Sequence, residues 1–215
     1  MIRAIDLQNT FKAVAAAIRD KRDYLCELDS FAGDGDHGIS MELGWNAVIE
    51  IPVTEQMDCG DYLKQCAKAF IAAVGASIGP LYGTAFLRAS SKFSGKTSVE
   101  ADDAVAAWKE AIQGIAQRGN AKLGDKTLLD TLLPCTETLE SSWKNGDSLV
   151  SILDKAAEAA EAGMLSTKDM ISNIGRSSRL GIRSKGGIDP GAASAYVVVK
   201  AIRDSIVEQS NLAKS

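Results

Sequence analysis

Three aspartates lie close together in a glycine-rich stretch near the N-terminus. Asp29 precedes the run Gly33-Asp34-Gly35-Asp36-His37-Gly38, so eight residues hold three carboxylates. Carboxylate oxygens suit a hard cation such as Mg²⁺, which usually binds one or two protein carboxylates together with the phosphates of a substrate. Gly38 opens a segment of helical character, whose free N–H groups could receive a phosphate. The pattern indicates nucleotide binding through a metal ion.

The same residues have a plainer interpretation, which spacing alone favours. Asp and Gly are the commonest turn residues, so an Asp-Gly-Asp stretch is most often a solvated turn. A calcium-binding EF-hand loop counted from Asp34 would need Gly at its sixth position and Glu at its twelfth, where the chain has Ile39 and Trp45. The EF-hand is therefore excluded, while the turn and the Mg²⁺ site both stay open.

The elements that must position these residues are predicted to be helices. Apolar residues recur every three or four positions along the first segment, as at Leu7, Phe11, Val14 and Ile18, and no segment alternates regularly between apolar and polar residues. We therefore predict an all-α fold without strands. Further predicted helices cover Gly38 to Ile49, Cys59 to Val74, Pro80 to Lys92, Leu128 to Trp143 and Leu149 to Ala162.

Capping signals mark two more helix starts. The run from Thr97 to Glu100 has the spacing of a capping box, which predicts a helix running toward Gln117. Asp189 followed by Pro190 predicts an N-cap and a first-turn proline. Pro134 is expected to kink the helix that contains it.

The composition is that of a globular protein. The chain has 215 residues, of which 46% are hydrophobic and 24% are charged, and no linker-like stretch divides it, so we predict a single domain over residues 1–215. The longest apolar stretches, such as Ala69 to Val74, are far too short to span a membrane. The first residues lack the apolar core of a signal peptide, so we expect no membrane association and a cytoplasmic location.

Two other classes of site have little support. Cys26, Cys59, Cys66 and Cys135 form no Cys-x-x-Cys pair and His37 is the single histidine, which argues against a zinc site and favours reduced, mostly buried thiols. The net charge is −4, from 24 basic and 28 acidic residues, so no nucleic-acid role is expected. Charge is nevertheless uneven, because residues 170–188 include no acidic residue and carry several basic ones, among them Arg176.

A P-loop, another common nucleotide-binding motif, is present only in part. The run Ser94-Gly95-Lys96-Thr97 imitates the end of a P-loop, but the first glycine of that motif would fall at Ser90, and a helix is predicted before it where a P-loop follows a strand. Rossmann and protein-kinase motifs are missing from the sequence as well.

Several motifs occur in the order found in one known family. The chain resembles the L subunit, or nucleotide-binding domain, of dihydroxyacetone kinases from about Leu7 to Ile206. The motifs that carry the resemblance are Leu28-Asp29 with Gly33 to Gly38, Gly79-Pro80-Leu81-Tyr82-Gly83-Thr84, Arg118-Gly119, Gly124-Asp125-Lys126-Thr127 with Asp130, Gly175-Arg176 with Leu180-Gly181, and Asp189-Pro190-Gly191-Ala192.

The resemblance implies a fold and a site. The fold is a barrel of about eight antiparallel helices with the nucleotide at one end. Asp29, Asp34 and Asp36 would hold two Mg²⁺ ions against the phosphates of ADP or ATP, and no side chain is assigned a catalytic role. The implied nucleotide contacts are His37, Gly38, Ile39, Ser40, Ser77, Ile78, Gly79, Gly119, Leu128, Arg176, Asp189, Pro190 and Gly191.

The chain departs from the family pattern at three positions. Where the family commonly has V-G-G-A-S-G-P, this sequence has V-G-A-S-I-G-P over residues 74–80, which places Ile78 at the usual serine position. Ser40 stands where asparagine is common, and Gly187 stands where histidine is common. These changes leave the three aspartates intact and alter residues expected on the substrate and partner sides of the site.

The resemblance implies half of an enzyme. This subunit would pass a phosphoryl group from a Mg²⁺-bound nucleotide to dihydroxyacetone held on a separate K subunit. The donor is either free ATP or a phosphotransferase-system protein that rephosphorylates bound ADP, and a chain without a fused K domain favours the second. A second copy of the chain is a further expected partner.

Three alternatives stay open. The first is a kinase subunit for another small keto-sugar, and the second is a non-catalytic module that binds nucleotide to regulate a partner. The third is the related nucleotide domain of fatty-acid kinases, which typically has D-G-D-T-G, so His37 at the threonine position argues against it.

Overall fold

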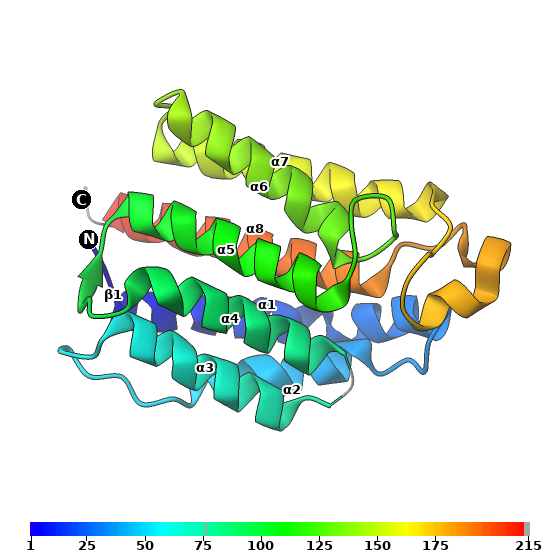
Figure 1. Ribbon diagram of the computed structural model, residues 1–215, viewed down its shortest axis with the longest axis horizontal. Coiled ribbons are helices and arrows are strands. Elements are labelled where there is room, and N and C mark those ends of the chain that lie inside the picture. The colour runs from blue at the N-terminus through cyan, green and yellow to red at the C-terminus, as the bar shows by residue number, and fades with distance from the viewer. Residues whose placement is uncertain (76, 213–215) are drawn as a thin grey trace. The chain divides into compact units, whose positions relative to one another are not determined.

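The computed structural model describes residues 1–75 and 77–212, which are mainly helical (Figure 1). This confirms the predicted all-α class. Along the described chain the elements are β1 (Ile2–Arg3), α1 (Ala4–Ser30), α2 (His37–Ile49), α3 (Cys59–Ala73), α4 (Ile78–Phe93), β2 (Ser98–Val99), α5 (Ala101–Gly119), α6 (Leu128–Lys144), α7 (Leu149–Ser166), η1 (Thr167–Asp169), η2 (Arg176–Ser184) and α8 (Pro190–Leu212), where η denotes a 3₁₀ helix.

The contacts of the chain fall into two compact units. Unit 1 consists of Met1–Ala16 and Ser40–Asn120, and unit 2 consists of Ala17–Ile39 and the chain from Ala121 onward. The long helix α1 and the shorter α2 each begin in one unit and continue into the other. The single domain over residues 1–215 stays a prediction.

Unit 1 is built around aromatic side chains. In its core, α3 packs against α4 and α4 packs against α5 (Figure 1). Trp45 of α2 meets the rings of Phe70 and Phe86 edge to face, at centroid distances of 6.0 and 5.9 Å. Phe70 in turn stacks on Tyr82 at 5.0 Å. Gly44 leaves room for this cluster, since a Cβ at that position would lie 2.4 Å from the ring of Phe70.

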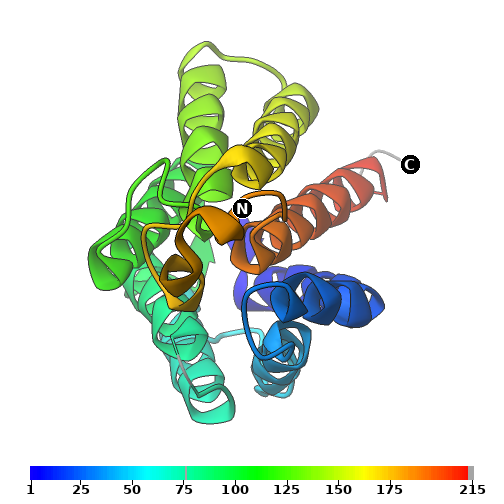
Figure 2. The same ribbon diagram turned by 90° about the vertical axis from the view of Figure 1, so that its right-hand side faces the viewer.

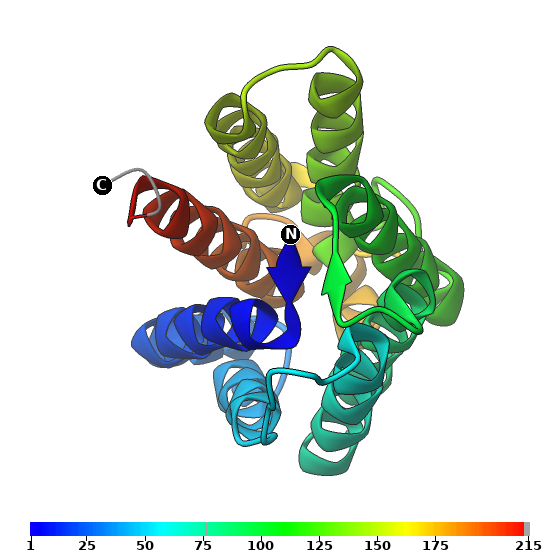
Figure 3. The ribbon, with the colours of Figure 1, turned by 90° about the vertical axis from the view of Figure 1, so that its left-hand side faces the viewer.

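Two short strands correct the prediction that the chain has none. β1 pairs with β2 in an antiparallel ladder, with Ile2 opposite Val99 (Figure 3). This pairing keeps residues 98–99 extended, so a helix cannot start at Thr97 as the sequence suggested. The capping box forms three residues later, between Glu100 and Asp103, and α5 begins at Ala101.

Unit 2 contains α6, α7 and α8, which pack against one another (Figures 1 and 2). Pro134 lies inside α6 and has no N–H to donate to the carbonyl of Asp130, four residues earlier. Gly163 of α7 packs against this carbonyl so closely that a Cβ would lie 2.1 Å from the oxygen. The proline and the glycine together therefore let α6 and α7 approach at their backbones.

The other helix predictions need small adjustments. α4 starts at Ile78, two residues before Pro80, and α7 continues to Ser166 beyond the predicted Ala162. Asp189 caps α8 as predicted, because its carboxylate accepts the N–H of Ala192 at 2.8 Å. All the cysteines are unpaired, and Cys26 is the least buried of them. Within the described chain no helix combines the length and apolar character needed to cross a membrane.

Candidate metal and nucleotide site

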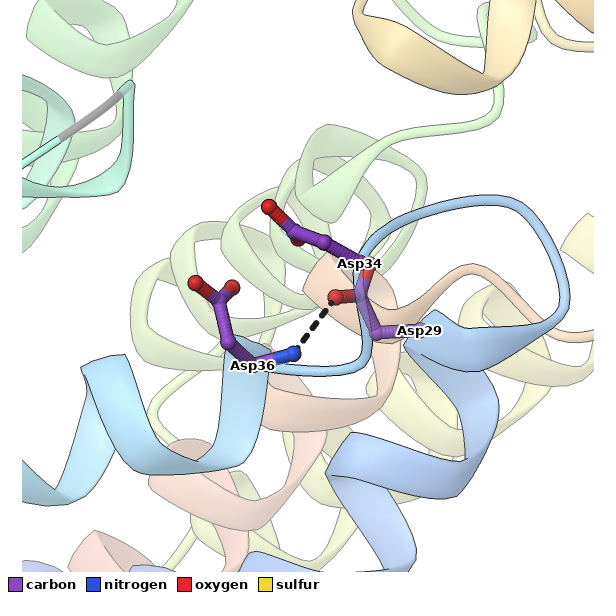
Figure 4. Close-up of side chains that lie close together, drawn as sticks. All are labelled: Asp29, Asp34 and Asp36. Atoms are coloured by element: carbon purple, nitrogen blue, oxygen red, sulfur yellow. Dashed lines mark hydrogen bonds between the residues drawn. The ribbon is translucent and has the colours of Figure 1, made fainter.

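The three aspartates meet in unit 2, at the turn between α1 and α2 (Figure 4). Asp29 lies near the C-terminal end of α1, and Asp34 and Asp36 belong to the loop that follows. One carboxylate oxygen from each residue lies within 4.8 Å of the others. Asp29 Oδ2 accepts the N–H groups of Gly35 at 2.9 Å and of Asp36 at 3.1 Å, which folds the loop back onto the end of α1.

Two glycines make this loop possible. A Cβ on Gly33 would lie 2.2 Å from Asp29 Oδ1, so a larger residue would push the carboxylate out of place. Gly35 has a φ of 77°, in the left-handed region that side chains disfavour. Gly33 therefore leaves room for the carboxylate of Asp29, and Gly35 allows the backbone of the turn.

The carboxylates differ in their electrostatic surroundings. Arg176 forms an ion pair with Asp34, and this contact holds the pKa of Asp34 below its usual value. Partial burial raises the pKa of Asp36, and the neighbouring charges of Asp34 and Asp29 add to this effect. Three carboxylates at this separation repel one another, and a set made only of oxygen ligands fits Mg²⁺.

Helix N-termini gather around the same part of unit 2. His37 is the first residue of α2, and its Nε2 lies 2.8 Å from Ser194 Oγ in the first turns of α8. At the start of α8, a Cβ on Gly191 would lie 3.6 Å from the backbone nitrogen of Leu128, the first residue of α6. The hydroxyl of Thr131 in α6 donates to the carbonyl of Ala192 at 3.0 Å.

This arrangement favours an anionic ligand. α8 is bonded to α2 through one side chain and to α6 through another, so the N-termini of three helices lie in one region. Helix N-termini carry partial positive charge and free N–H groups, and they are common binding sites for phosphate. Close approach of backbone is needed here too, because a Cβ on Gly38 would lie 2.0 Å from the carbonyl oxygen of Arg22 in α1.

Asp189 lies immediately before α8, next to Pro190 and Gly191. Its N–H donates to Thr167 Oγ1 at 3.1 Å while its carboxylate caps the helix. Burial of the carboxylate raises the pKa of Asp189 to about 7, against the opposing effects of the Ala192 N–H and the charge of Lys126. Asp189 therefore changes charge near neutral pH.

The structure brings together only part of the predicted contact set. The residues that lie in unit 2 are Asp29, Asp34, Asp36, His37, Gly38, Ile39, Leu128, Arg176, Asp189, Pro190 and Gly191. The contacts described above connect most of them. Ser40, Ser77, Ile78, Gly79 and Gly119 belong to unit 1. Their part in a common site stays a prediction.

The unit 1 residues have clear local settings. Ser77 is exposed and precedes α4, and Ile78 is the first residue of that helix. Gly79 approaches the chain before it so closely that a Cβ would lie 2.1 Å from the carbonyl oxygen of Val74. Ala76, which belongs to the same motif, lies outside the described residues. Gly119 ends α5.

Gly187, one of the departures from the family pattern, has an aromatic neighbour. A Cβ at this position would lie 3.0 Å from Cδ1 of Phe31, in the loop after α1. Phe31 is 54% exposed. A histidine at position 187 would have to displace this ring, so Phe31 in its present position requires a small residue at position 187.

Several residues that organise the site are not among the contacts predicted from the sequence. Lys126 and Asp130 belong to the motif Gly124-Asp125-Lys126-Thr127 with Asp130, and both are buried and hydrogen-bonded. Asp130 accepts the N–H groups of Gly124 at 2.6 Å and Thr127 at 2.7 Å, and this signal was readable as a capping box at Thr127. Nothing in the sequence pointed to Ser194, whose role depends on packing between helices distant in the chain.

Comparison with known proteins agrees with this picture. Residues 31–204 match the DAK2 domain family. The ADP-binding subunit DhaL of a PEP-dependent dihydroxyacetone kinase from Listeria innocua is 35% identical over 196 residues, which cover 90% of this chain and 90% of that protein. A D-erythrulose kinase from Mycolicibacterium smegmatis is 34% identical over 200 residues, covering 91% of this chain and 34% of the longer kinase.

A solved structure shows the same fold. The dihydroxyacetone kinase from C. freundii, in complex with AMP-PNP and Mg²⁺, matches with a TM-score of 0.72 and 24% identity over 92% of this chain and 33% of that one. The sequence relatives confirm the resemblance inferred from the ordered motifs. This chain belongs to the DAK2 domain family, among the L-type subunits of the dihydroxyacetone kinases.

Proposed function

We propose that this protein is the nucleotide-binding, phosphoryl-transfer subunit of a dihydroxyacetone kinase. The observation that carries the proposal is the meeting of Asp29, Asp34 and Asp36 in the unit where three helix N-termini gather. A metal-bound phosphate chain needs carboxylates on one side and N–H donors on the other. Both are present within unit 2.

Different residues are proposed to bind the metal and the phosphates. Asp29, Asp34 and Asp36 would bind Mg²⁺, two ions in our proposal, while His37, Gly38, Ile39 and Ser40 at the start of α2 would face the phosphates. When bound, Mg²⁺ neutralises charge on the phosphate oxygens during transfer. Arg176 supplies a fixed pair of donors for phosphate or ribose. Leu128, Asp189, Pro190 and Gly191 would enclose the nucleotide. Ser77, Ile78, Gly79 and Gly119 are proposed as nucleotide contacts from the family resemblance alone.

The acceptor and the donor would both come from other proteins. We propose a separate K subunit that holds dihydroxyacetone, and a phosphotransferase-system protein that returns phosphate to bound ADP. The name of the Listeria relative, a PEP-dependent kinase with an ADP-binding subunit, supports this donor over free ATP. The proposal places the protein in the cytoplasm, where nucleotides and such donors are found.

A second acceptor is favoured by one specific comparison. The Mycolicibacterium relative is named a D-erythrulose kinase, and a four-carbon keto-sugar differs from dihydroxyacetone by one added carbon. Gly187 and Ile78 are two of the three positions at which this chain departs from the family pattern. A kinase for such a sugar is therefore the second candidate.

The first experiment tests nucleotide and metal together. Purified protein is denatured after preparation with Mg²⁺ or with EDTA, and the released nucleotide is identified and quantified. Near-stoichiometric ADP with Mg²⁺ and none with EDTA is the expected result. The variant Asp36→Asn should lose this retention, whereas Asp20→Asn, which changes an exposed carboxylate of α1, should keep it. Equal retention by Asp36→Asn and the unaltered protein would remove the metal assignment.

The second experiment identifies the acceptor. A cognate K subunit is added, and phosphorylation of dihydroxyacetone and of D-erythrulose is measured with phosphoenolpyruvate and the phosphotransferase proteins, or with ATP. Turnover of either sugar supports a kinase and selects between the two candidates. Tight nucleotide binding without turnover of either would support a regulatory module.

A further inference from the structure

Lys126 is a buried cation whose partners are all backbone carbonyls. Only 4% of its surface is exposed. Its ammonium group donates to the carbonyl oxygens of Thr167 at 2.8 Å, Met170 at 3.4 Å and Gly187 at 2.6 Å. An ammonium group has three N–H donors, so these contacts use all of them.

The three carbonyls lie at the two ends of one stretch of chain. The basic segment, residues 170–188, begins beside Met170 and ends beside Gly187, and it contains η2 with Arg176. The N–H of Gly186 also donates to the carbonyl of Lys168 at 2.8 Å, which holds the two ends of the segment together through the backbone. Lys126 therefore holds the start and the end of the basic segment together from inside.

A second contact fixes the segment further along. Asn173 donates its backbone N–H to the carbonyl of Asp125 at 3.2 Å, and its side-chain amide donates to the carboxylate of the same residue at 3.2 Å. Ser184 accepts the N–H of Ser172 at 2.9 Å, which ties the two limbs of the segment to each other. The basic segment is thus attached at Asp125 and Lys126, two consecutive residues of the Gly-Asp-Lys-Thr motif.

Lys126 itself sits in an unusual backbone conformation. Its φ is 60°, in the left-handed region that residues with a side chain rarely adopt. Asp130 holds the surrounding turn through its bonds to the N–H groups of Gly124 and Thr127. The turn directs the long side chain of Lys126 inward, where burial lowers its pKa and the charges of Asp189 and Asp169 oppose that effect.

At its exposed side, the basic segment meets the aspartate loop. Arg176 forms its ion pair with Asp34, one of the three clustered carboxylates. Asp189, which follows the segment, caps α8 beside the other helix N-termini. The two residues that the basic segment brings to the site therefore depend on where its ends are held.

We propose that Lys126 is a positioning residue for the nucleotide site, acting through Arg176 by fixing the two ends of the basic segment. The inference rests on the proposed function for the nucleotide that Arg176 would contact. Lys126 touches neither the aspartates nor the helix N-termini through any of the hydrogen bonds described for it. The hydrogen bonds of Lys126 therefore act on the site through the segment, and its charge acts in addition on Asp189, which follows the segment.

A double-mutant cycle separates positioning from general stability. Lys126→Met keeps much of the side-chain volume and removes the ammonium group, and Arg176→Ala removes the proposed ligand contact. Affinity for Mg·ADP is measured by titration calorimetry for each variant and for the double variant. We expect each single change to weaken binding about tenfold and the double variant to be within about twofold of Arg176→Ala. If Lys126 had a merely structural role, the losses of Mg·ADP affinity in the two single variants would multiply in the double variant. This result would overturn the proposal.

Hydrogen exchange provides a readout that needs no nucleotide. In Lys126→Met, peptides covering residues 170–188 should exchange at least several-fold faster, while peptides from α6 and α7 keep their protection. The matched control is Lys168→Met, the same change at an exposed lysine just before the segment. Unchanged exchange in Lys126→Met, or equal acceleration in the control, would contradict the proposal.

A second variant serves if Lys126→Met does not fold. Asn173→Ala removes one side-chain bond at the other attachment and leaves the backbone bond in place. It should accelerate exchange in the same peptides and weaken Mg·ADP binding several-fold, again without further loss in combination with Arg176→Ala. Exchange and affinity equal to those of the unaltered protein would overturn the attachment. If the unaltered protein binds no Mg·ADP, the proposed function fails, and the exchange data alone decide whether Lys126 holds the segment.

Discussion

His37 and Ser194 connect the first residue of α2 to the second turn of α8 through a hydrogen bond of 2.8 Å between Nε2 and Oγ. Burial lowers the pKa of His37, while the charge of Asp29 acts in the opposite direction. Ser194 is fully buried and also donates to the carbonyl of Gly191 at 3.0 Å. One serine therefore orients the histidine beside the aspartate loop.

The change Ser194→Ala tests this orientation. Loss of a buried hydrogen bond costs about 1–2 kcal/mol, which corresponds to roughly a tenfold loss of Mg·ADP affinity if His37 contacts the phosphates. Titration calorimetry measures the affinity. The control is Ser205→Ala, another buried serine of α8. It should lower the melting temperature without affecting binding, and a matching loss of affinity in the control would contradict the prediction.

Gly163→Ala should destabilise the protein, although alanine is the better helix former. In a helix interior this change ordinarily gains up to about 1 kcal/mol. Here the new Cβ would lie 2.1 Å from the carbonyl oxygen of Asp130, a backbone atom that can move only if α6 and α7 separate. We expect a net loss of at least about 2 kcal/mol in urea denaturation.

Gly114→Ala is the matched control for this prediction. Gly114 also lies inside a helix, but a Cβ there would meet only side-chain atoms, Cγ of Arg88 at 2.6 Å and Cγ2 of Thr84 at 3.2 Å, which can shift without separating two backbones. We expect a change within about 1 kcal/mol of zero. If both variants lose the same stability, the close approach of α6 and α7 is not the cause.

Asp189 should make stability fall as pH rises toward neutrality. Its pKa is about 7 in the folded protein, against 3.8 for an ordinary aspartate, so the folded state binds the proton more tightly. Its contribution is fully present below about pH 4 and is lost as pH rises through about 7. Asp189→Asn keeps a cap for α8 and removes the titration. The variant should gain about 1–3 kcal/mol relative to the unaltered protein between pH 5 and pH 8.

Urea denaturation at the two pH values measures this difference. Asp58→Asn is a suitable control, because Asp58 caps α3 through the N–H of Asp61 at 2.8 Å in an exposed contact. It reports the effect of exchanging a capping carboxylate for an amide. An Asp189→Asn variant whose advantage is the same at both pH values would rule out the buried titration.

Asp29 and Asp36 should respond differently to the same change. Asp29→Asn replaces the charged oxygen that accepts the N–H groups of Gly35 and Asp36 with a neutral amide oxygen, so both hydrogen bonds weaken, the aspartate loop should loosen and stability should fall by about 1 kcal/mol. Asp36→Asn removes a charge that the neighbouring aspartates repel, so stability without metal should hold or rise. Both variants should lose the stabilisation given by Mg·ADP.

Thermal denaturation with and without Mg·ADP separates the two effects. The unaltered protein should melt at a higher temperature when the ligand is present, because a ligand that binds only the folded state stabilises it. A Mg·ADP-dependent rise that persists in Asp36→Asn would show that this carboxylate is no metal ligand. A melting temperature of Asp29→Asn equal to that of Asp36→Asn would show that the backbone contacts of Asp29 carry little energy.

Helix periodicity and local capping chemistry were readable from the sequence. The spacing of apolar residues predicted nearly all of the helices, because each helix buries a stripe of its own residues. The N-cap at Asp189 was predicted correctly because it depends on residues three apart in the chain. The predicted start of α5 was wrong, because Ser98 and Val99 pair with Arg3 and Ile2, which are almost a hundred positions earlier in the chain.

The clustering of Asp29, Asp34 and Asp36 was also determined locally, since eight residues with glycines at the right places can fold onto themselves. The tertiary structure alone decided that Arg176 meets Asp34, that Ser194 meets His37 and that Lys126 joins the two ends of residues 170–188. These contacts join residues that are separated by between 41 and 157 positions in the chain. No pattern of neighbouring residues encodes such pairs, because they form only when whole helices pack and bring their ends together.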